Sequence, residues 1–242
     1  MTIKTHSLTV SGIRVAVVRK AIKNLHLGVY PPDGHVRIAV PLAVSDAAVK
    51  VAIISKLKWI KERQTEFDKQ ARESKRELVS GESHFYLGRR YRLNVIETKR
   101  AGRIVLGDRD TLELHIRQGT DVAGRDMVLQ RWYRERLREL VPVLLEKWQE
   151  QLDVEVKYWG IKRMKTRWGS CNPKARRIWL NLELVKKPPH CLEYIVVHEL
   201  AHLIVRRHDD RFKTLLDQHL PKWRSVRKEL NTSTLADEKW EF

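Results

Sequence analysis

The amino-acid sequence predicts a mixed α+β protein. Three observations indicate this class: apolar residues that alternate with polar ones in the first 120 residues, apolar residues at helical spacing in the rest, and His198 and His202 one helical turn apart. We therefore expect a β-rich N-terminal region with one long helix over 1–120, a metal-binding catalytic region over 121–231, and a tail over 232–242.

The composition is that of a globular but strongly basic protein. The chain has 242 residues, with 48 Lys and Arg against 30 Asp and Glu, so its net charge is +18. This excess predicts attraction to anions such as nucleic acid or nucleotide phosphates without naming one of them. Only Cys171 and Cys191 are present, which excludes a disulfide framework and a four-cysteine zinc site. With no leader-like or bilayer-length apolar run, we expect a cytoplasmic protein that does not enter a membrane.

The first region is predicted to contain a β-hairpin followed by a helix. Two alternating apolar runs, 25–29 and 36–40, flank a Pro-Pro-Asp-Gly turn. Ser45 can cap the helix that follows, and its apolar spacing extends to about residue 72. No internal repeat is evident.

The remaining elements follow from the same rules. Polar residues 73–83 predict a linker, and short strands are expected between 86 and 116. A helix over about 124–150 contains Pro142, which should kink or split it. Strands are then predicted at 154–158 and 177–182, and helices at about 190–206 and 209–230.

The pattern His198-Glu199-Leu-Ala-His202 indicates a metal site. On a helix, side chains four residues apart project from one face, so both imidazoles can bind one metal ion. Glu199 follows the first histidine directly, and in this arrangement its carboxylate reaches the water that the metal activates, as a general base does. The alternative is a pair of solvated histidines on a charged helix.

A catalytic zinc site takes a third protein ligand, and His208 is our candidate. The helix must then end near residue 206 so that the chain can turn back. The spacing equals that of the metzincins, but Val205 stands where those proteins have glycine, so the turn must differ. The alternative ligands are Asp209, Asp210, Asp217 and His219.

Several segments around this pattern resemble the YgjP-like metal-dependent hydrolases, which are zincin relatives of the SprT and WLM metallopeptidase groups. The similar segments are 165–172, 178–184, 194–202 and 208–212. The resemblance extends over about 20–231 and leaves the tail outside. It implies a zincin-like fold for the catalytic half, a metal on His198, His202 and His208, and Glu199 as the catalytic base.

Three further residues are candidates for binding substrate: Arg167, Trp168 and Asn181. Arg167 could hold a substrate anion or the oxyanion of the reaction, or it could form a structural salt bridge. Asn181 could equally satisfy backbone groups near the cleft. We expect the strand at 177–182 to be an edge strand that pairs with extended substrate. The basic run from Lys162 to Arg177 would form the rim of the cleft.

We therefore expect a metallopeptidase that holds one zinc ion, or another divalent metal, per chain and uses Glu199 as general base. One alternative is a nucleoside-triphosphate pyrophosphatase or phosphohydrolase whose basic residues hold phosphates. A second is a non-catalytic basic module that binds nucleic acid. The expected partners are a polypeptide or nucleotide substrate and, through the basic surface, nucleic acid without sequence preference.

Overall fold

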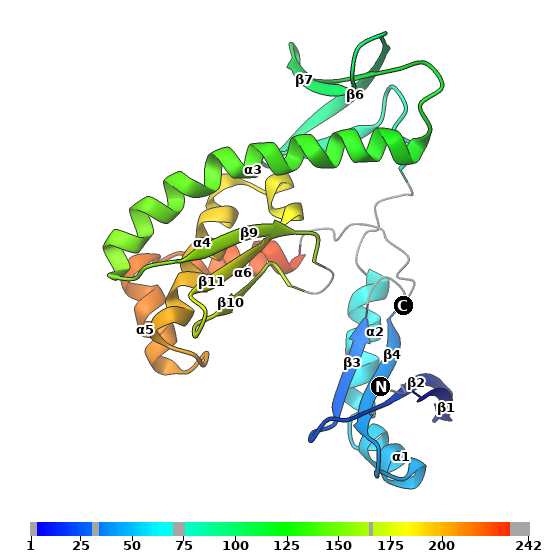
Figure 1. Cartoon of the computed structure of the whole chain (residues 1–242). Coiled ribbons are helices and arrows are strands. Elements are labelled where there is room, and N and C mark those ends of the chain that lie inside the picture. Colours follow the sequence, from blue (N-terminus) through cyan, green and yellow to red (C-terminus); the bar gives the residue numbers. More distant parts are fainter. Residues whose placement is uncertain (1–3, 31–33, 70–75, 165–166, 233–242) are drawn as a thin grey trace. The chain divides into compact units, whose positions relative to one another are not determined.

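The computed structural model describes residues 4–30, 34–69, 76–164 and 167–232 (Figure 1). The described residues form two compact units, one within 4–69 and the other within 76–232. The tail expected over 232–242 lies outside the described residues except for its first residue. No helix within the described ranges is long and apolar enough to cross a membrane.

The first unit is a four-stranded sheet with two helices. Its strands, in spatial order, are β1 (Lys4–Val10), β2 (Ile13–Lys20), β4 (His35–Pro41) and β3 (His26–Tyr30). Strands β3 and β4 are antiparallel, which confirms the predicted hairpin, whereas β2 and β4 are parallel. Val15, Val17 and Ile38 are buried beneath the helices of this unit.

The single helix predicted over 45–72 is in fact two helices, α1 (Asp46–Ile54) and α2 (Leu57–Lys69). Ser45 caps α1 as expected, because its Oγ accepts a hydrogen bond of 3.3 Å from the N–H of Ala48. The first helix stops at Ser55, whose N–H still bonds carbonyl groups of the last turn. Ile53 of α1 and Ile60 of α2 are buried in the same core.

The second unit opens with a sheet of the same topology. Its strands, in spatial order, are β5 (Ser83–Tyr86), β6 (Arg89–Glu97), β8 (Thr111–Ile116) and β7 (Arg103–Gly107). The helix α3 (Val122–Leu152) follows and passes through Pro142 without splitting. Buried side chains on both sides of the proline, including Val141 and Leu145, fix this helix to the core and offset the missing hydrogen bond.

The two four-stranded sheets form an internal structural repeat, contrary to our expectation. Both begin with an antiparallel hairpin, pair their second and fourth strands in parallel, and place the third strand at the far edge. The hairpin turns match in detail: Ser11 and Leu87 have φ of 49° and 48°, and Gly12 and Gly88 have φ of 80° and 81°. The first hairpin of each sheet has the same turn geometry and register, whereas the β3–β4 and β7–β8 hairpins differ in register by one residue. Apart from the glycine of the turn, the sequence gives no sign of the repeat.

The rest of the second unit is a three-stranded sheet and a group of helices. The sheet has the order β10 (Gly169–Asn172), β11 (Arg177–Asn181), β9 (Tyr158–Lys162). A 3₁₀ helix, η1 (Leu182–Lys186), precedes α4 (Pro189–Ile204), α5 (Asp210–His219) and α6 (Trp223–Thr232). The helix predicted over 209–230 is split at Leu220 and Pro221.

Strand β11 is central, so the prediction that 177–182 is an edge strand is wrong. It lies between β9, to which it is parallel, and β10, to which it is antiparallel. Among the described residues β10 has no partner on its outer side. Gly169–Asn172 is therefore one of the two edges of this sheet, together with β9, at which another chain could add.

The compact units also differ from the division that we expected at residue 120. Leu93 and Leu112 of the second sheet share one buried core with Leu137 of α3 and with Val196 and Leu200 of α4. Figure 1 shows α3 lying between that sheet and α4. The strands over 83–116 and the histidine-bearing helix α4 are therefore parts of one compact unit, because α3 packs apolar side chains against both of them.

Candidate metal centre

The helix α4 presents the two histidines and Glu199 at the wall of a cavity. Pro189 occupies the first helical position, where its missing N–H costs nothing. The buried residues Ile195, Val196 and Leu200 fix the helix against the core. Since His198 and His202 are one turn apart, they share the remaining face.

The chain turns back after α4 without a glycine. The helix ends at Ile204, earlier than expected, and Val205 has φ of −126° and ψ of 114°. This is ordinary extended backbone, which valine adopts readily, so the turn needs no residue with positive φ. His208 lies three residues later, before α5, and returns to the other two histidines.

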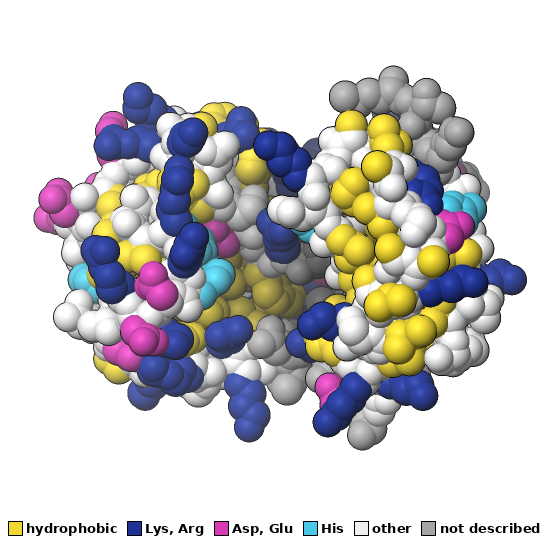
Figure 2. Space-filling view, turned by 90° about the horizontal axis from the view of Figure 1, so that it is seen from below, with side chains coloured by type: hydrophobic (Ala, Val, Ile, Leu, Met, Phe, Trp, Pro, Cys, Tyr) yellow, Lys and Arg dark blue, Asp and Glu magenta, His cyan; other side chains and the backbone are white. Residues whose placement is uncertain are grey.

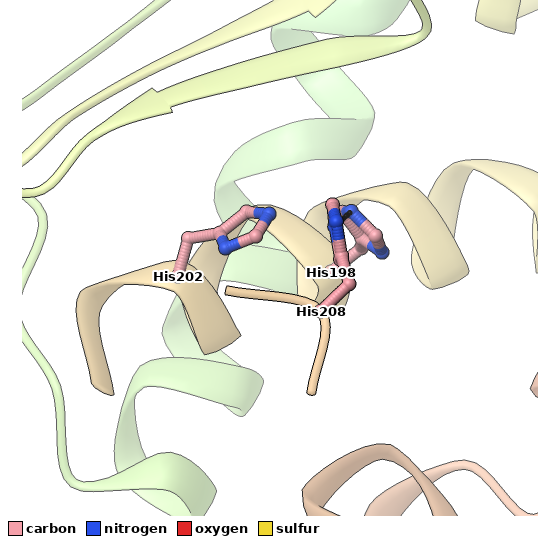
Figure 3. Close-up of side chains that lie close together, drawn as sticks. All are labelled: His198, His202 and His208. Carbon is pink, nitrogen blue, oxygen red and sulfur yellow. Dashed lines mark hydrogen bonds between the residues drawn. The ribbon is translucent and has the colours of Figure 1, made fainter. Parts of the chain in front are cut away.

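The three histidine side chains converge on one point (Figure 3). Ring centroids are 5.0 Å apart for His198 and His202, 4.7 Å for His202 and His208, and 4.9 Å for His198 and His208. One ring nitrogen from each lies within 4.8 Å of the others. The Phe212 ring packs against all three, with centroid distances of 4.8 to 5.0 Å.

The protonation states of the three histidines suit the binding of a metal cation. Burial lowers the pKa of His198 to about 3, helped by the two neighbouring histidines and Arg227. Burial also lowers the pKa values of His202 and His208, so all three rings are neutral at pH 7. Neutral imidazole is the form that coordinates metals.

The hydrogen bonds leave ligand atoms available. His202 Nδ1 lies 3.1 Å from the Val205 carbonyl oxygen, which can only accept, so the proton is on Nδ1 and Nε2 has a free lone pair. The Nε2 atoms of His198 and His208 are 3.0 Å apart. His198 Nδ1 is buried and has no hydrogen-bond partner among the described residues. The three imidazoles could therefore hold one divalent metal ion.

Glu199 lies beside the histidines and is buried, with 5% of its surface exposed. Burial raises the pKa of Glu199 to about 8, and the positive charge of Arg167 opposes this rise. Gly169 of β10 packs directly against the carboxyl group. Cys171 is on the same strand, and burial raises the pKa of its thiol to about 11, so it is not a thiolate at pH 7.

A cavity of about 690 Å³ contains these groups. The three histidines and Glu199 form one wall, residues 167–171 form another, and α6 contributes Arg227 and Leu230. Of the predicted substrate residues, Arg167 and Trp168 line this cavity, and Arg167 forms no ion pair with a described residue. The salt-bridge alternative for Arg167 thus has no partner in the described part of the chain.

Asn181 does not line the cavity, unlike the expectation that it binds substrate. Its Nδ2 donates 2.8 Å hydrogen bonds to the carbonyls of Met164 and Arg167, and its Oδ1 accepts one of 3.2 Å from the N–H of Met164. Its side chain therefore holds the loop that presents Arg167.

The alternative metal ligands have other partners. Asp209 caps α5 by accepting a hydrogen bond of 3.2 Å from Phe212, and Asp210 pairs with Lys213 at 2.8 Å. Asp217 accepts a hydrogen bond of 2.8 Å from Trp223, and the His219 ring packs edge-on against Trp148. None of these four joins the histidine cluster within the described residues.

The basic run Lys162–Arg177 forms less of the cavity rim than expected. Lys162 lies over the Trp179 ring at 3.6 Å, and Arg176 pairs with Glu155 at 2.9 Å. Of this run only Arg167 lines the cavity among the described residues; Lys165 lies outside them. Sequence reasoning missed Arg206 and Arg227, which reach the cavity from other elements. Figure 2 shows Lys and Arg side chains at many places on the face in view, where Asp and Glu are fewer.

A second group of ligand-type side chains joins α4 to α6. It contains His190, Cys191 and Glu229, whose ligand atoms also lie within 4.8 Å of one another. His190 Nε2 is 2.8 Å from Glu229 Oε2. Cys191 is buried, and burial raises the pKa of its thiol to about 12.

Comparison with known proteins identifies the family of the chain. The model of the YgjP-like metallopeptidase domain matches residues 23–233, which is most of the chain. The protein is therefore a metal-dependent hydrolase of the metallopeptidase class. It belongs to the YgjP-like metallopeptidase family.

Similarity to individual proteins is slight. A solved structure, the metallopeptidase zymogen of Methanocaldococcus jannaschii jannalysin, is 21% identical over 39% of this chain and 92% of that chain, with a TM-score of 0.32. No curated protein matches the chain.

Proposed function

We propose that the protein is a zinc metallopeptidase in which His198, His202 and His208 hold one zinc ion and Glu199 is the general base. The observation that supports this most directly is the convergence of three neutral imidazoles beside a buried carboxylate. The catalytic region would comprise the residues expected over 121–231 together with the strands that share their core.

The donor set favours zinc. Three imidazole nitrogens leave a coordination position open, as catalytic zinc sites do, whereas structural sites use four protein ligands. The Val205 carbonyl supports the ligand His202, an arrangement that fixes ring orientation and strengthens the nitrogen as a donor. Zinc in such a site supplies a Lewis acid and lowers the pKa of a water molecule to about 7.

Glu199 would move the protons of the reaction. Its carboxylate would take a proton from the attacking water and give it to the amine that leaves when the peptide bond breaks. A base must be ionised, and burial alone opposes ionisation of Glu199. The positive charge of Arg167 favours the carboxylate, as a bound divalent cation also would.

Strand β10 would position the substrate. Gly169, Ser170 and Cys171 line the cavity from an edge strand, and an extended polypeptide can pair with the outer backbone groups of such a strand. Trp168, Ile195 and Leu230 add apolar surface for side chains of the substrate. An edge strand beside a reactive centre suits a polypeptide.

The test is cleavage of an unfolded polypeptide such as casein by the zinc-loaded chain, with nucleoside triphosphates offered in parallel. We expect peptide-bond cleavage that chelation abolishes and added zinc restores. Release of pyrophosphate or phosphate without any peptide cleavage would contradict the proposal and favour the nucleotide alternative.

A further inference from the structure

Three arginines line the cavity, and the proposed mechanism gives a role to only one of them, Arg167. Arg167 comes from the loop before β10, Arg206 from the turn after α4, and Arg227 from α6. All three side chains are exposed and line the same cavity as the histidines. Since they come from separate elements, no local sequence pattern brings them together.

Other arginines of this unit form ion pairs with carboxylates, and these three form none with a described residue. Arg176 pairs with Glu155 at 2.9 Å and Arg89 with Asp110 at 2.8 Å. Within 76–164 and 167–232, no carboxylate pairs with the guanidinium of Arg167, Arg206 or Arg227. Of the described residues that line the cavity, Glu199 alone has a carboxyl group, and it is buried.

The charges act at the reactive centre and not only at a distant rim. Arg227 lowers the pKa values of both His198 and His208, and Arg167 acts in the same direction on Glu199. Positive charge without an ion-pair partner among the described residues thus faces whatever binds beside the histidines.

We propose that Arg167, Arg206 and Arg227 select acidic polypeptide segments, with Asp or Glu side chains on either side of the bond that is cut. This inference rests on the proposed function and names the substrate class of that site. A guanidinium binds a carboxylate through two parallel hydrogen bonds, and it repels the Lys and Arg side chains of basic segments.

The surroundings favour carboxylates on a polypeptide over the phosphates of a nucleotide. The three guanidiniums are spread around a cavity of about 690 Å³ and come from three elements, whereas phosphate sites commonly use a Gly-rich loop with several backbone N–H groups. The same cavity has an edge strand on one side and the apolar residues Trp168, Ile195 and Leu230. Those features match successive residues of an extended chain.

The expected preference is large enough to measure. A hydrogen bond to a charged group contributes enough for about a tenfold change in affinity, so each arginine that meets a carboxylate should contribute roughly that factor. Because the side chains are exposed, the preference should decline as salt rises.

The experiment measures binding separately from cleavage. Three fluorescent peptides identical except for four positions, filled with Glu, Gln or Lys, are titrated with the zinc-loaded Glu199→Gln chain, and anisotropy gives the affinities. We expect the Glu peptide to bind at least about tenfold more tightly than the Gln peptide, and the Lys peptide to bind most weakly. Equal affinity for the Glu and Gln peptides would overturn the inference.

Single variants then test the residues. Arg227→Gln and Arg206→Gln, each added to Glu199→Gln, should reduce the Glu preference by about tenfold. The matched control is Arg138→Gln, which removes the same charge from an exposed position of α3 outside the cavity lining and should leave the preference unchanged. Equal effects of Arg227→Gln and Arg138→Gln would show a general charge effect and overturn the assignment.

A charge reversal excludes misfolding as the explanation. Arg227→Glu should improve binding of the Lys peptide relative to the Glu peptide, and a damaged cavity cannot produce such a gain. A nucleoside triphosphate is added as a competitor of the bound Glu peptide. If the chain binds the triphosphate more tightly than the Glu peptide, the assignment of the cavity to carboxylates is wrong.

Cleavage by the wild-type chain separates this inference from the proposed function. Cleavage of all three peptides at equal rates, with equal binding, would overturn the substrate class and leave the metallopeptidase proposal intact. Selective binding of the Glu peptide with no cleavage of any peptide would support the arginine site and contradict the peptidase.

Discussion

Gly169 leaves no room for a side chain beside Glu199. A Cβ atom at residue 169 would lie 2.5 Å from Glu199 Oε1 and 2.8 Å from its Cγ. The glycine in the Arg-Trp-Gly-Ser-Cys segment is therefore required by the close approach of β10 to α4. Its φ is not in the left-handed region, so backbone freedom does not explain it.

Gly169→Ala should reduce peptidase activity while zinc stays bound. The added methyl group must displace the carboxyl group of Glu199, and a misplacement of about 1 Å can cost about 100-fold in rate. Gly160→Ala is the matched control, because its Cβ would meet Trp179 at 2.4 Å in the same sheet, away from the cavity lining. That variant should lose about 1–3 kcal/mol of stability but keep its kcat. Equal kcat losses in both variants would contradict the assignment.

Glu199→Gln should remove activity without removing the metal. Glutamine has nearly the same shape but cannot take a proton, and a positioned base contributes about 10²–10⁴-fold. The loss should appear in kcat, since the interaction is made in the transition state. Zinc content, melting temperature and turnover of one preparation decide the matter: full turnover with zinc bound would end the proposed mechanism.

His208→Ala should weaken zinc binding more than the roughly 10–100-fold typical of losing a group that only supports a ligand. Asp209→Ala should cost stability through the lost cap of α5, about 1 kcal/mol, while zinc remains. His190→Ala tests the second group, and it should leave one zinc per chain. Elemental analysis after zinc loading and desalting checks all three. A loss of zinc from His190→Ala but not from His208→Ala would reverse the ligand assignment.

Folding stability should decline in mild acid because of His84. This side chain is buried, and burial lowers its pKa to about 4, with Arg76 acting in the same direction and Glu82 against it. The unfolded chain has the ordinary value near 6.5, so below that pH the unfolded state binds the extra proton. The contribution of His84 to the free energy of unfolding should therefore fall by up to about 1.4 kcal/mol per pH unit between about pH 6.5 and 4.

The zinc-free chain is the material for this measurement, because acid also releases metal from histidine sites. Urea unfolding from pH 8 to 4 should show the slope in the wild type. His84→Asn keeps an acceptor for Arg76, whose Nη1 is 2.9 Å from His84 Nδ1, and should make the curve shallower. The slope that remains comes from His198, His202 and His208, whose pKa values burial also lowers. A variant curve parallel to that of the wild type would assign the pH dependence to other groups.

Nucleic-acid binding remains a prediction from net charge. With +18 charges the chain should bind DNA or RNA at low salt, without sequence preference and with affinity that falls steeply as salt rises. Fluorescence titration at several salt concentrations measures the slope. Tight binding at high salt would point to a dedicated site that net charge does not explain.

The sequence predicted features that depend on residues close together in the chain. The spacing of His198 and His202 follows from helix geometry, and the hairpin of β3 and β4 follows from alternation around a turn. That His208 lies beside His198 and His202 could be inferred only from the expectation that a catalytic zinc site has a third ligand. The turn before it needs no glycine, because the backbone of Val205 is extended.

Features that depend on long-range packing escaped prediction. The edge position of β10 depends on which strand β11 pairs with, and a four-residue strand has too little pattern to reveal this. Arg206 and Arg227 looked like ordinary surface charges, because only the fold brings them to the cavity. The compact units divide near residue 75 because α3 is apolar toward both the second sheet and α4, and sequence periodicity does not say which partners a helix has.

The matching sheets of the two units have an evolutionary consequence. Ser45 and Asp121, which cap the helices after each sheet, follow the two matching turns at the same distance along the chain. This is the pattern that duplication of one ancestral segment leaves. The sheet of the second unit shares its core with α3, the helix that packs on the histidine-bearing α4. The sheet of the first unit has a core of its own, with Val15 and Ile38, so one architecture serves two separate cores in this chain.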